Sequence, residues 1–348
     1  MLAVTLADLL YRARQFLIAI LGTGLVFGLA LLLSGLANGF TVEINQTVAG
    51  FGADTFVMAG SSAGRITAFV AFPQSEVLAV RHDPGVSDAA PLLLVPSLVA
   101  QTTKGTSTVV LAGVREGALG APSPISGHAL AGPGQAVVDD RLHVALNSVI
   151  AFGHHAFTVV GLVSDRSLLG GVPVVYVPLA DAQALAVGGR PIVTAVLATG
   201  RPTTVPPGLR PYTTEEVQAS SVQQLSGPIK SIKNTQWLMW VVAAVIVAAL
   251  LYVAALERRR DFAVLKALGS SSAALFGSLL LEAVIVALVA SAFAEVASNL
   301  LTPIMSQPVD IPGLAYATLP LIAVVVGALA SLVALRRATG ADPAAAFS

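Results

Sequence analysis

Few residues in this chain have types and spacings that could support catalysis. Asp139 and Asp140 are adjacent carboxylic acids of the kind that general acid–base catalysis uses. They also precede a stretch of helical character, residues 141–146, and acidic side chains at such a position commonly cap a helix. We interpret the pair as a helix cap, with an acid–base role as the alternative.

The histidines and glycine-containing loops do not complete a metal or nucleotide motif. His154 and His155 are adjacent, so in a strand their side chains point to opposite faces, and no H-x-x-x-H spacing occurs. The loop at residues 60–65 lacks the lysine of a phosphate-binding loop, and no G-x-S-x-G motif is present. We therefore predict no catalytic residue, no metal site and no cofactor bound by this chain.

Glu282 is unusual because it lies inside a long apolar run. A carboxylate within a membrane span is costly and usually has a function. We interpret Glu282 as an intramembrane polar residue that packs or hydrogen-bonds against a neighbouring helix. A proton relay is the alternative.

The densest group of basic residues directly follows another apolar run. Residues 257–269 read E-R-R-R-D-F-A-V-L-K-A-L-G, which predicts a short amphipathic helix that ends at a glycine. On physical grounds this helix either docks on a partner or only fixes membrane orientation, because positive loops are general in membrane proteins. The residues of this segment are Arg258, Arg259, Arg260, Asp261, Phe262, Leu265, Lys266, Leu268 and Gly269.

Composition sets the class of protein that must position these residues. The 348 residues are 55% hydrophobic and only 11% charged, with a mean hydropathy of +0.81. Soluble domains average about 25% charged residues, so this chain is predicted to lie in a membrane. The formal net charge is zero, which gives no reason to expect a nucleic-acid partner, and the absence of cysteine excludes disulfides and thiolate chemistry.

Apolar runs and their flanks predict an integral membrane protein with four transmembrane α-helices. A large α+β extracytoplasmic domain is inserted between the first and second of them on helical stalks. The predicted segments are 1–15 (cytoplasmic, amphipathic), 16–37 (first span), 38–235 (stalk and head, the head at about 50–220), 236–256 (second span), 257–274 (cytoplasmic turn), 275–300 (third span), 301–315 (external loop), 316–335 (fourth span) and 336–348 (cytoplasmic tail).

The first span carries two features with open interpretations. Arg12 and Arg14 could begin a signal peptide, but the apolar run after them is longer than the ~7–15 residues of a signal-peptide core, so we predict an uncleaved span. Gly24 and Gly28 form a small-xxx-small pair that lets another helix approach closely. Packing within the subunit and dimerisation explain this pair equally well.

Periodic apolar residues beyond the first span predict the stalks. Leu36, Phe40, Ile44 and Val48 recur every four residues, and a second stripe precedes the second span, with Pro228 as a predicted kink. Between the stalks, runs of β character alternate with possible helices. The predicted strands are 54–58, 107–111, 135–138, 156–163 and 172–177, and the predicted helices are 74–81, 179–187 and one after an N-cap at 213 or 214.

Charge asymmetry predicts the topology. Basic residues flank the N-terminus, the 257–266 turn and the C-terminus, whereas the 302–315 loop has none. Positive flanks favour the cytoplasm, so both termini are predicted to be cytoplasmic and the head extracytoplasmic.

Several of these stretches resemble one family. Residues 257–271, followed by Leu279-Leu-Leu-Glu-Ala, look like the signature of the FtsX/MacB-type (type VII) ABC transporter permeases. The C-terminal residues 335–346 are similar to the closing segment of that family. In the head, residues 132–140 and 157–161 resemble the MacB periplasmic core domain.

The resemblance implies a non-catalytic permease of the bacterial cell membrane. It implies a homodimer among membrane lipids, docked on a separate cytoplasmic ATPase that binds ATP and Mg, with residues 258–269 as the coupling helix. Two functions stay open: export of a substrate, or FtsX-like mechanotransmission to an extracytoplasmic partner such as a cell-wall hydrolase or an adaptor. A membrane-anchored external enzyme is a weaker third reading.

Overall fold

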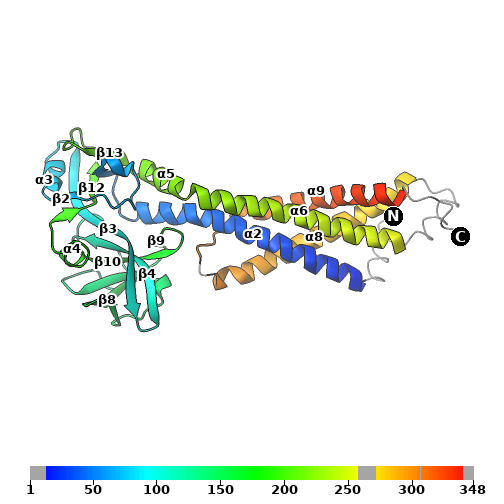
Figure 1. Cartoon of the computed structure of the whole chain (residues 1–348), viewed down its shortest axis with the longest axis horizontal. Helices are drawn as coiled ribbons and strands as arrows, with labels where there is room; N and C mark the ends of the chain where they lie inside the picture. Colours follow the sequence, from blue (N-terminus) through cyan, green and yellow to red (C-terminus); the bar gives the residue numbers. More distant parts are fainter. Residues whose placement is uncertain (1–12, 258–271, 306, 340–348) are drawn as a thin grey trace. The chain divides into compact units, whose positions relative to one another are not determined.

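A computed structural model of the chain describes residues 13–257, 272–305 and 307–339. It divides into two compact units, a helical unit (Met1–Gly39 and Ile229–Ser348) and a sheet unit (Phe40–Pro228). Figure 1 labels the helices and strands of both units.

The helical unit is a bundle of long apolar helices. They are α2 (Ala13–Ala49, whose last ten residues belong to the sheet unit), α6 (Ser226–Glu257), α8 (Ser272–Leu301) and α9 (Gly313–Thr339), with the short 3-10 helix η3 (Thr302–Ile304) after α8. The core of the bundle combines large side chains such as Phe27 and Leu31 with many alanines from α8 and α9. Small residues let the helices approach closely, as membrane bundles require.

Within the described residues, three helices are long and apolar enough to cross a membrane: Phe16–Ala49, Ser226–Ala249 and Leu280–Ile304. A shorter apolar helix covers Gly313–Leu329. The prediction of a membrane protein agrees with these helices, while the count of four spans stays a prediction. Because a span needs only about 20 residues, the 37-residue helix α2 extends beyond the predicted first span at 16–37.

The sheet unit contains an 11-stranded sheet and a separate pair of short strands. Its strands are β1 (Thr55–Ala59), β2 (Phe72–Pro73), β3 (Val86–Thr102), β4 (Gly105–Val114), β5 (Ser126–Gly127), β6 (Gln135–Asp139), β7 (Val149–Phe152), β8 (His155–Val163), β9 (Ser167–Leu168), β10 (Val172–Pro178), β11 (Ile192–Val193), β12 (Ala195–Gly200) and β13 (Leu209–Thr213). The main order is β13-β1-β12-β3-β4-β10-β6-β8-β5. Since β7 pairs with both β3 and β8, the strands β3, β4, β10, β6, β8 and β7 close into a ring.

Both faces of this sheet are buried. One face packs against α3 (Glu76–Arg81) and α4 (Leu179–Val187), and the other packs against α5 (Thr214–Gln224) and the last turns of α2. Strand β4 shows the alternation: Val109 and Leu111 face the first core, whereas Val110 and Ala112 face the second. A strand buried on both sides reads as a continuous apolar run, as this one does.

Most predicted elements of the α+β domain are confirmed. The predicted strands coincide with β1, β4, β6, β8 and β10, the predicted helices with α3 and α4, and Thr213 caps α5 with a complete capping box. The helix expected at residues 141–146 is wrong, because only the 3-10 turn η2 (Asp140–Leu142) forms there before His143 enters the left-handed region at φ 52°.

The kink expected at Pro228 is displaced. Helix α5 ends at Gln224 and α6 begins at Ser226, so the break falls at Leu225. Pro228 then lies in the first turn of α6, where a residue without an N–H is tolerated because that turn has unpaired N–H groups in any case.

Candidate functional site

The predicted coupling segment, Arg258–Gly269, lies outside the described residues. The structure places its flanks: α6 ends at Glu257 and α8 begins at Ser272. The assignment of a docking role to these residues therefore stays a prediction.

Glu282 lies on α8 and is only 1% exposed. Its neighbour Ala283 is fully buried beside Val247 of α6. A Cβ atom on Gly327 of α9 would stand 3.0 Å from the Ala283 carbonyl oxygen, so the backbones of α8 and α9 approach closely at this level. Glu282 is thus held inside the bundle, where its predicted packing role stays a prediction.

Gly24 and Gly28 both face α8 of the same chain. A Cβ atom on Gly24 would stand 2.6 Å from the Phe293 ring and 3.0 Å from the Ala290 carbonyl oxygen. At Gly28 the nearest atom, the carbonyl oxygen of Ala294, would be 3.5 Å away, which is ordinary contact. The two glycines therefore differ, since only Gly24 has no room for a side chain.

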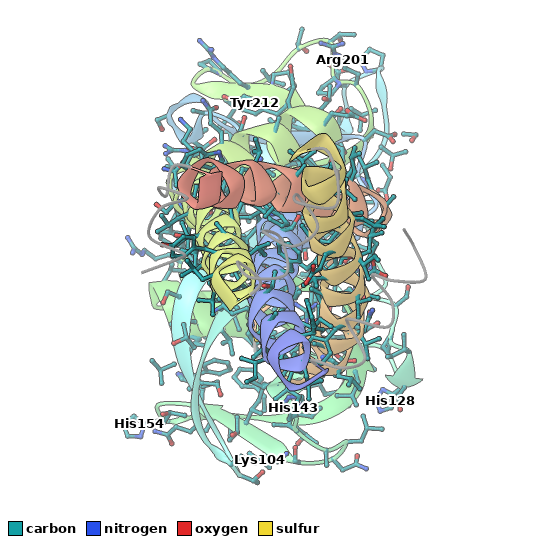
Figure 2. All side chains as sticks on the ribbon, turned by 90° about the vertical axis from the view of Figure 1, so that its right-hand side faces the viewer. Lys104, His128, His143, His154, Arg201 and Tyr212 are labelled. Carbon is teal, nitrogen blue, oxygen red and sulfur yellow. The ribbon has the colours of Figure 1, made fainter. Side chains whose placement is uncertain are left out.

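The histidines do not converge. Figure 2 shows His154 well apart from His128 and His143 in the sheet unit. Within the described ranges, no three His, Asp or Glu residues lie close enough together to hold a metal ion.

An open groove of about 650 Å³ lies at the start of α5 in the sheet unit. Its polar lining includes Asp54, Arg201 and Glu215. One carboxylate oxygen of Asp54 already accepts a 2.8 Å hydrogen bond from the N–H of Gly200.

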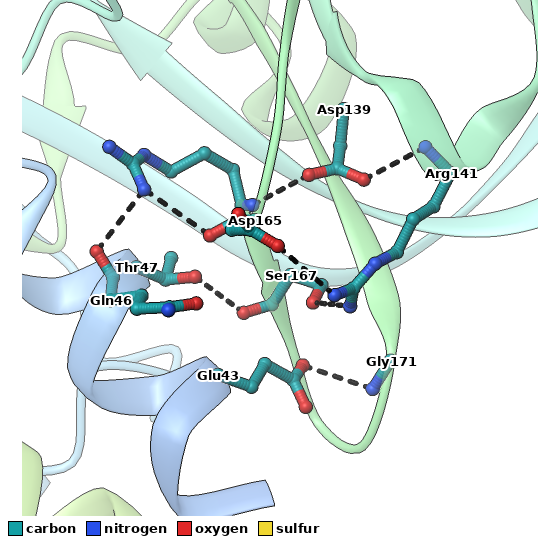
Figure 3. A network of polar contacts seen from close by, with 9 residues as sticks. Glu43, Gln46, Thr47, Asp139, Arg141, Asp165, Ser167 and Gly171 are labelled. Carbon is teal, nitrogen blue, oxygen red and sulfur yellow. Dashed lines mark hydrogen bonds and ion pairs between the residues drawn. The ribbon is translucent and has the colours of Figure 1, made fainter. Parts of the chain in front are cut away.

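The most distinctive polar cluster joins the end of α2 to the segment between β8 and β10 (Figure 3). We call residues 165–171 the clasp, because this segment folds against one face of α2. Thr47 donates a 2.6 Å hydrogen bond from its hydroxyl to the carbonyl oxygen of Ser167. The N–H of Gly171 donates a 3.0 Å hydrogen bond to Oε1 of Glu43.

The clasp is tied to the sheet through Asp139 at the end of β6. One oxygen of Asp139 accepts from the N–H of Arg141 at 3.0 Å and the other from the N–H of Arg166 at 2.6 Å. The Arg141 guanidinium donates a 2.6 Å hydrogen bond to the Ser167 hydroxyl and lies 3.5 Å from Asp165. Asp139 therefore caps η2, as predicted, and also anchors the clasp.

Burial controls the charge of the two acids in this cluster. Glu43 is 3% exposed and Asp139 is fully buried. Burial raises the pKa of Glu43 to about 7, although the Gly171 N–H, the Ser167 hydroxyl and the Arg141 charge oppose this shift. Burial likewise raises the pKa of Asp139 to about 6 against its two backbone hydrogen bonds. Both acids belong to the sheet unit, and Glu43 follows the predicted first span at 16–37 on the part of α2 that extends beyond it.

Sequence reasoning did not identify this cluster, although one signal was present. Glu43 is the one charged residue between Arg14 and Asp54. A lone acid within a long apolar helix is a candidate for a specific polar partner. Its partner on the clasp is 128 residues away in the chain and could not be inferred from spacing.

Comparisons with known proteins cover nearly the whole chain. The family model for the MacB-like periplasmic core domain matches residues 16–208, and the model for the FtsX-like permease C-terminal region matches residues 236–343. An uncharacterised ABC transporter permease of Mycobacterium bovis is 36% identical over 347 residues, covering 100% of this chain and 99% of that protein. A second such permease, from Mycobacterium tuberculosis, is 35% identical over 347 residues with the same coverage.

Among solved structures, the periplasmic region of MacB from Actinobacillus actinomycetemcomitans aligns with 51% of this chain and 96% of that chain, with 13% identity and a TM-score of 0.36. The two mycobacterial permeases share a much larger fraction of identical residues with this chain than the MacB periplasmic region does. The alignments with these two permeases extend over both the sheet unit and the helical unit.

Proposed function

We propose that this chain, which belongs to the FtsX/MacB-type family of ABC transporter permeases, works together with a separate cytoplasmic ATPase. In this proposal, it couples ATP hydrolysis by that ATPase to movement of its own extracytoplasmic domain. The observation that carries this proposal is the presence of both family regions in one chain, at residues 16–208 and 236–343. The sequence has no phosphate-binding loop of its own. ATP and Mg are therefore assigned to the partner.

The contact with the ATPase is assigned to the segment after α6. In the predicted helix, Phe262, Leu265 and Leu268 supply an apolar docking face. The basic residues Arg258–Arg260 and Lys266 meet lipid headgroups or acidic groups of the ATPase. In the proposed four-span topology, this segment and both termini lie in the cytoplasm.

The part of the protein that the ATP-driven movement displaces is assigned to the sheet unit. The last turns of α2, through Ile44 and Val48, and helix α5, through Val217, are built into the second core of the sheet. A core packed this closely transmits displacement instead of absorbing it. Movement of α2 or α5 thus acts directly on the sheet.

Export of a substrate is the favoured use of this movement, because the sheet unit matches the MacB-like core domain. The alternative is an FtsX-like relay that switches an external partner such as a cell-wall hydrolase. Purification of the native complex separates the two, since an adaptor or cargo supports export and a hydrolase supports the relay.

A matched pair of variants tests the coupling. Leu265→Asp places a charge on the predicted docking face, whereas Ala267→Asp places the same charge on the opposite face. We expect the ATPase of the reconstituted complex to lose its permease-dependent stimulation with Leu265→Asp and to keep it with Ala267→Asp. Normal stimulation by folded, inserted Leu265→Asp would contradict the docking role, and ATP turnover by the purified chain alone would contradict the assignment itself.

A further inference from the structure

The clasp contacts α2 at successive turns of one helical face. Phe40 packs its ring against Gly170, Glu43 accepts from Gly171, and Thr47 donates to Ser167. Residues 40, 43 and 47 are spaced as neighbours along one side of a helix. The clasp therefore links this face of α2 to strands β9 and β10 through polar contacts.

The clasp backbone is held in an uncommon conformation. Leu169, Gly170 and Gly171 all have positive φ angles, of 57°, 85° and 101°. A non-glycine residue in this region costs free energy that the surrounding contacts must offset. The contacts to α2 are such an offset, so release of α2 favours rearrangement of the clasp.

The charges in the clasp do not balance when both buried acids are ionised. Glu43 and Asp139 share one guanidinium, that of Arg141, whose side chain is 33% exposed. The other ionisable groups near the pair include Asp165, whose carboxylate lies 3.5 Å from the Arg141 guanidinium, and Arg166, whose N–H donates to Asp139. Asp140 lies beside Asp139, and Tyr176 is buried nearby, where burial raises its pKa.

The hydrogen bonds favour Glu43 over Asp139 as the acid that carries a proton. Both oxygens of Asp139 accept backbone hydrogen bonds, which stabilise its ionised form. Oε2 of Glu43 is buried and has no hydrogen-bond partner among the described residues. A buried carboxylate oxygen without a donor is costly, whereas the same oxygen as a neutral O–H is less so.

We propose that Glu43 and Asp139 form a proton-binding site that sets how tightly the clasp holds α2. With the site protonated, the clasp is closed and only one of the two buried acids is ionised beside Arg141, which also pairs with the exposed Asp165. When the proton leaves, a second negative charge is buried and the closed form is disfavoured. This inference concerns the sheet unit alone and does not depend on the proposed coupling to an ATPase.

The sign of the pH dependence follows from the raised pKa values. In the open clasp the acids return toward their ordinary values of 4.5 and 3.8. The closed form is then fully favoured in acid and loses stability as pH rises through about 6 to 7. Linkage of one proton predicts that the opening equilibrium increases roughly tenfold or more from about pH 5 to about pH 7.

Hydrogen exchange of the intact chain in detergent micelles or nanodiscs tests this site. The readout is the exchange of clasp amides relative to their intrinsic rate at each pH. We expect loss of protection on going from about pH 5 to about pH 7, and we expect Glu43→Gln, a neutral isostere, to remove most of that change. Glu116→Gln, at an exposed carboxylate, should keep the wild-type profile.

A further variant separates the proton site from mere packing. Thr47→Val removes a clasp contact without a titratable group, so it should loosen the clasp equally at every pH. If wild-type clasp protection is independent of pH, the proposal is wrong whether or not any variant folds. It is also wrong if Glu43→Gln retains the wild-type pH profile.

Discussion

The hydroxyl of Thr47 and the carbonyl oxygen of Ser167 are joined by a 2.6 Å hydrogen bond between two residues that are both fully buried. The bond connects α2 to β9 across 120 positions of the chain. A buried carbonyl that loses its donor cannot turn to water instead, so this contact matters more than its length suggests.

Replacement of Thr47 by valine tests that contact. Thr47→Val keeps the shape of the side chain but leaves the Ser167 carbonyl without this donor, and we expect the free energy of unfolding to fall by about 1–3 kcal/mol. Thr47→Ser keeps the hydroxyl and should lose less. Thermal unfolding of the detergent-solubilised chain measures both, and a larger loss with Thr47→Ser would show that packing of the methyl group dominates.

The glycines of α2 give a second prediction, in which similar residues behave differently. Gly24→Ala should destabilise the chain by about 1–3 kcal/mol, because its Cβ atom meets Phe293 and the backbone of Ala290. Gly22→Ala, with no atom within 4 Å, and Gly28→Ala should be neutral or stabilising by up to about 1 kcal/mol. The check is thermal unfolding of the three variants side by side, and equal effects would contradict the tighter packing at Gly24.

The elements that follow from local pattern were predictable. Apolar runs located α2, α6, α8 and α9, and the β-type runs located β4, β8 and β10, because burial of each element selects its own periodicity. Strand β3 was missed. It contains Pro91 and Pro96, which usually argue against a strand, and β3 accommodates Pro96 where its register shifts between Val95 and Leu98.

The clasp was not predictable for a different reason. Its polar contacts join residues more than a hundred positions apart, and the acids involved have no spacing that identifies a partner. Asp139 was predicted as a cap from its neighbours, and that local role is correct. Its second hydrogen bond, from the N–H of Arg166, depends on β6 and β8 lying in parallel, which only the fold supplies.

Asp83 gives a prediction for acid conditions. Its carboxylate accepts hydrogen bonds from the backbone and hydroxyl of Thr203 and of Thr204 and from the N–H of Gly85. These bonds, the Thr203 N–H foremost, hold the pKa of Asp83 well below its ordinary value of 3.8. A depressed pKa stabilises the fold above the ordinary value, and this contribution is lost as pH falls below about 4.

We therefore expect Asp83→Asn to lower the melting temperature at neutral pH and to flatten its decline below about pH 4. Asp88→Asn, at a side chain that is 50% exposed, serves as the control and should change neither. Melting curves of the solubilised chain over a pH series provide the measurement. An unchanged acid limb in Asp83→Asn would show that other carboxylates cause the decline.

The homodimer that the family resemblance implies gives the last prediction. Only 11% of the apolar stretch of α6 is buried within the chain, compared with 50% for α2 and 39% for α8. Val241 and Val245 lie one turn apart on α6 and are 39% and 62% exposed, so this face is the one that a second copy would cover. In a two-fold dimer the same surface patch meets itself, which brings equivalent residues close together.

Because the chain contains no cysteine, Val241→Cys and Val245→Cys create single thiols, and we expect at least one to form a disulfide-linked dimer in native membranes. Leu321→Cys on α9, at a side chain that is 67% exposed, should remain monomeric under the same oxidation. Crosslinking of Leu321→Cys as readily as the α6 variants, or of none of them, would argue against a dimer built on α6.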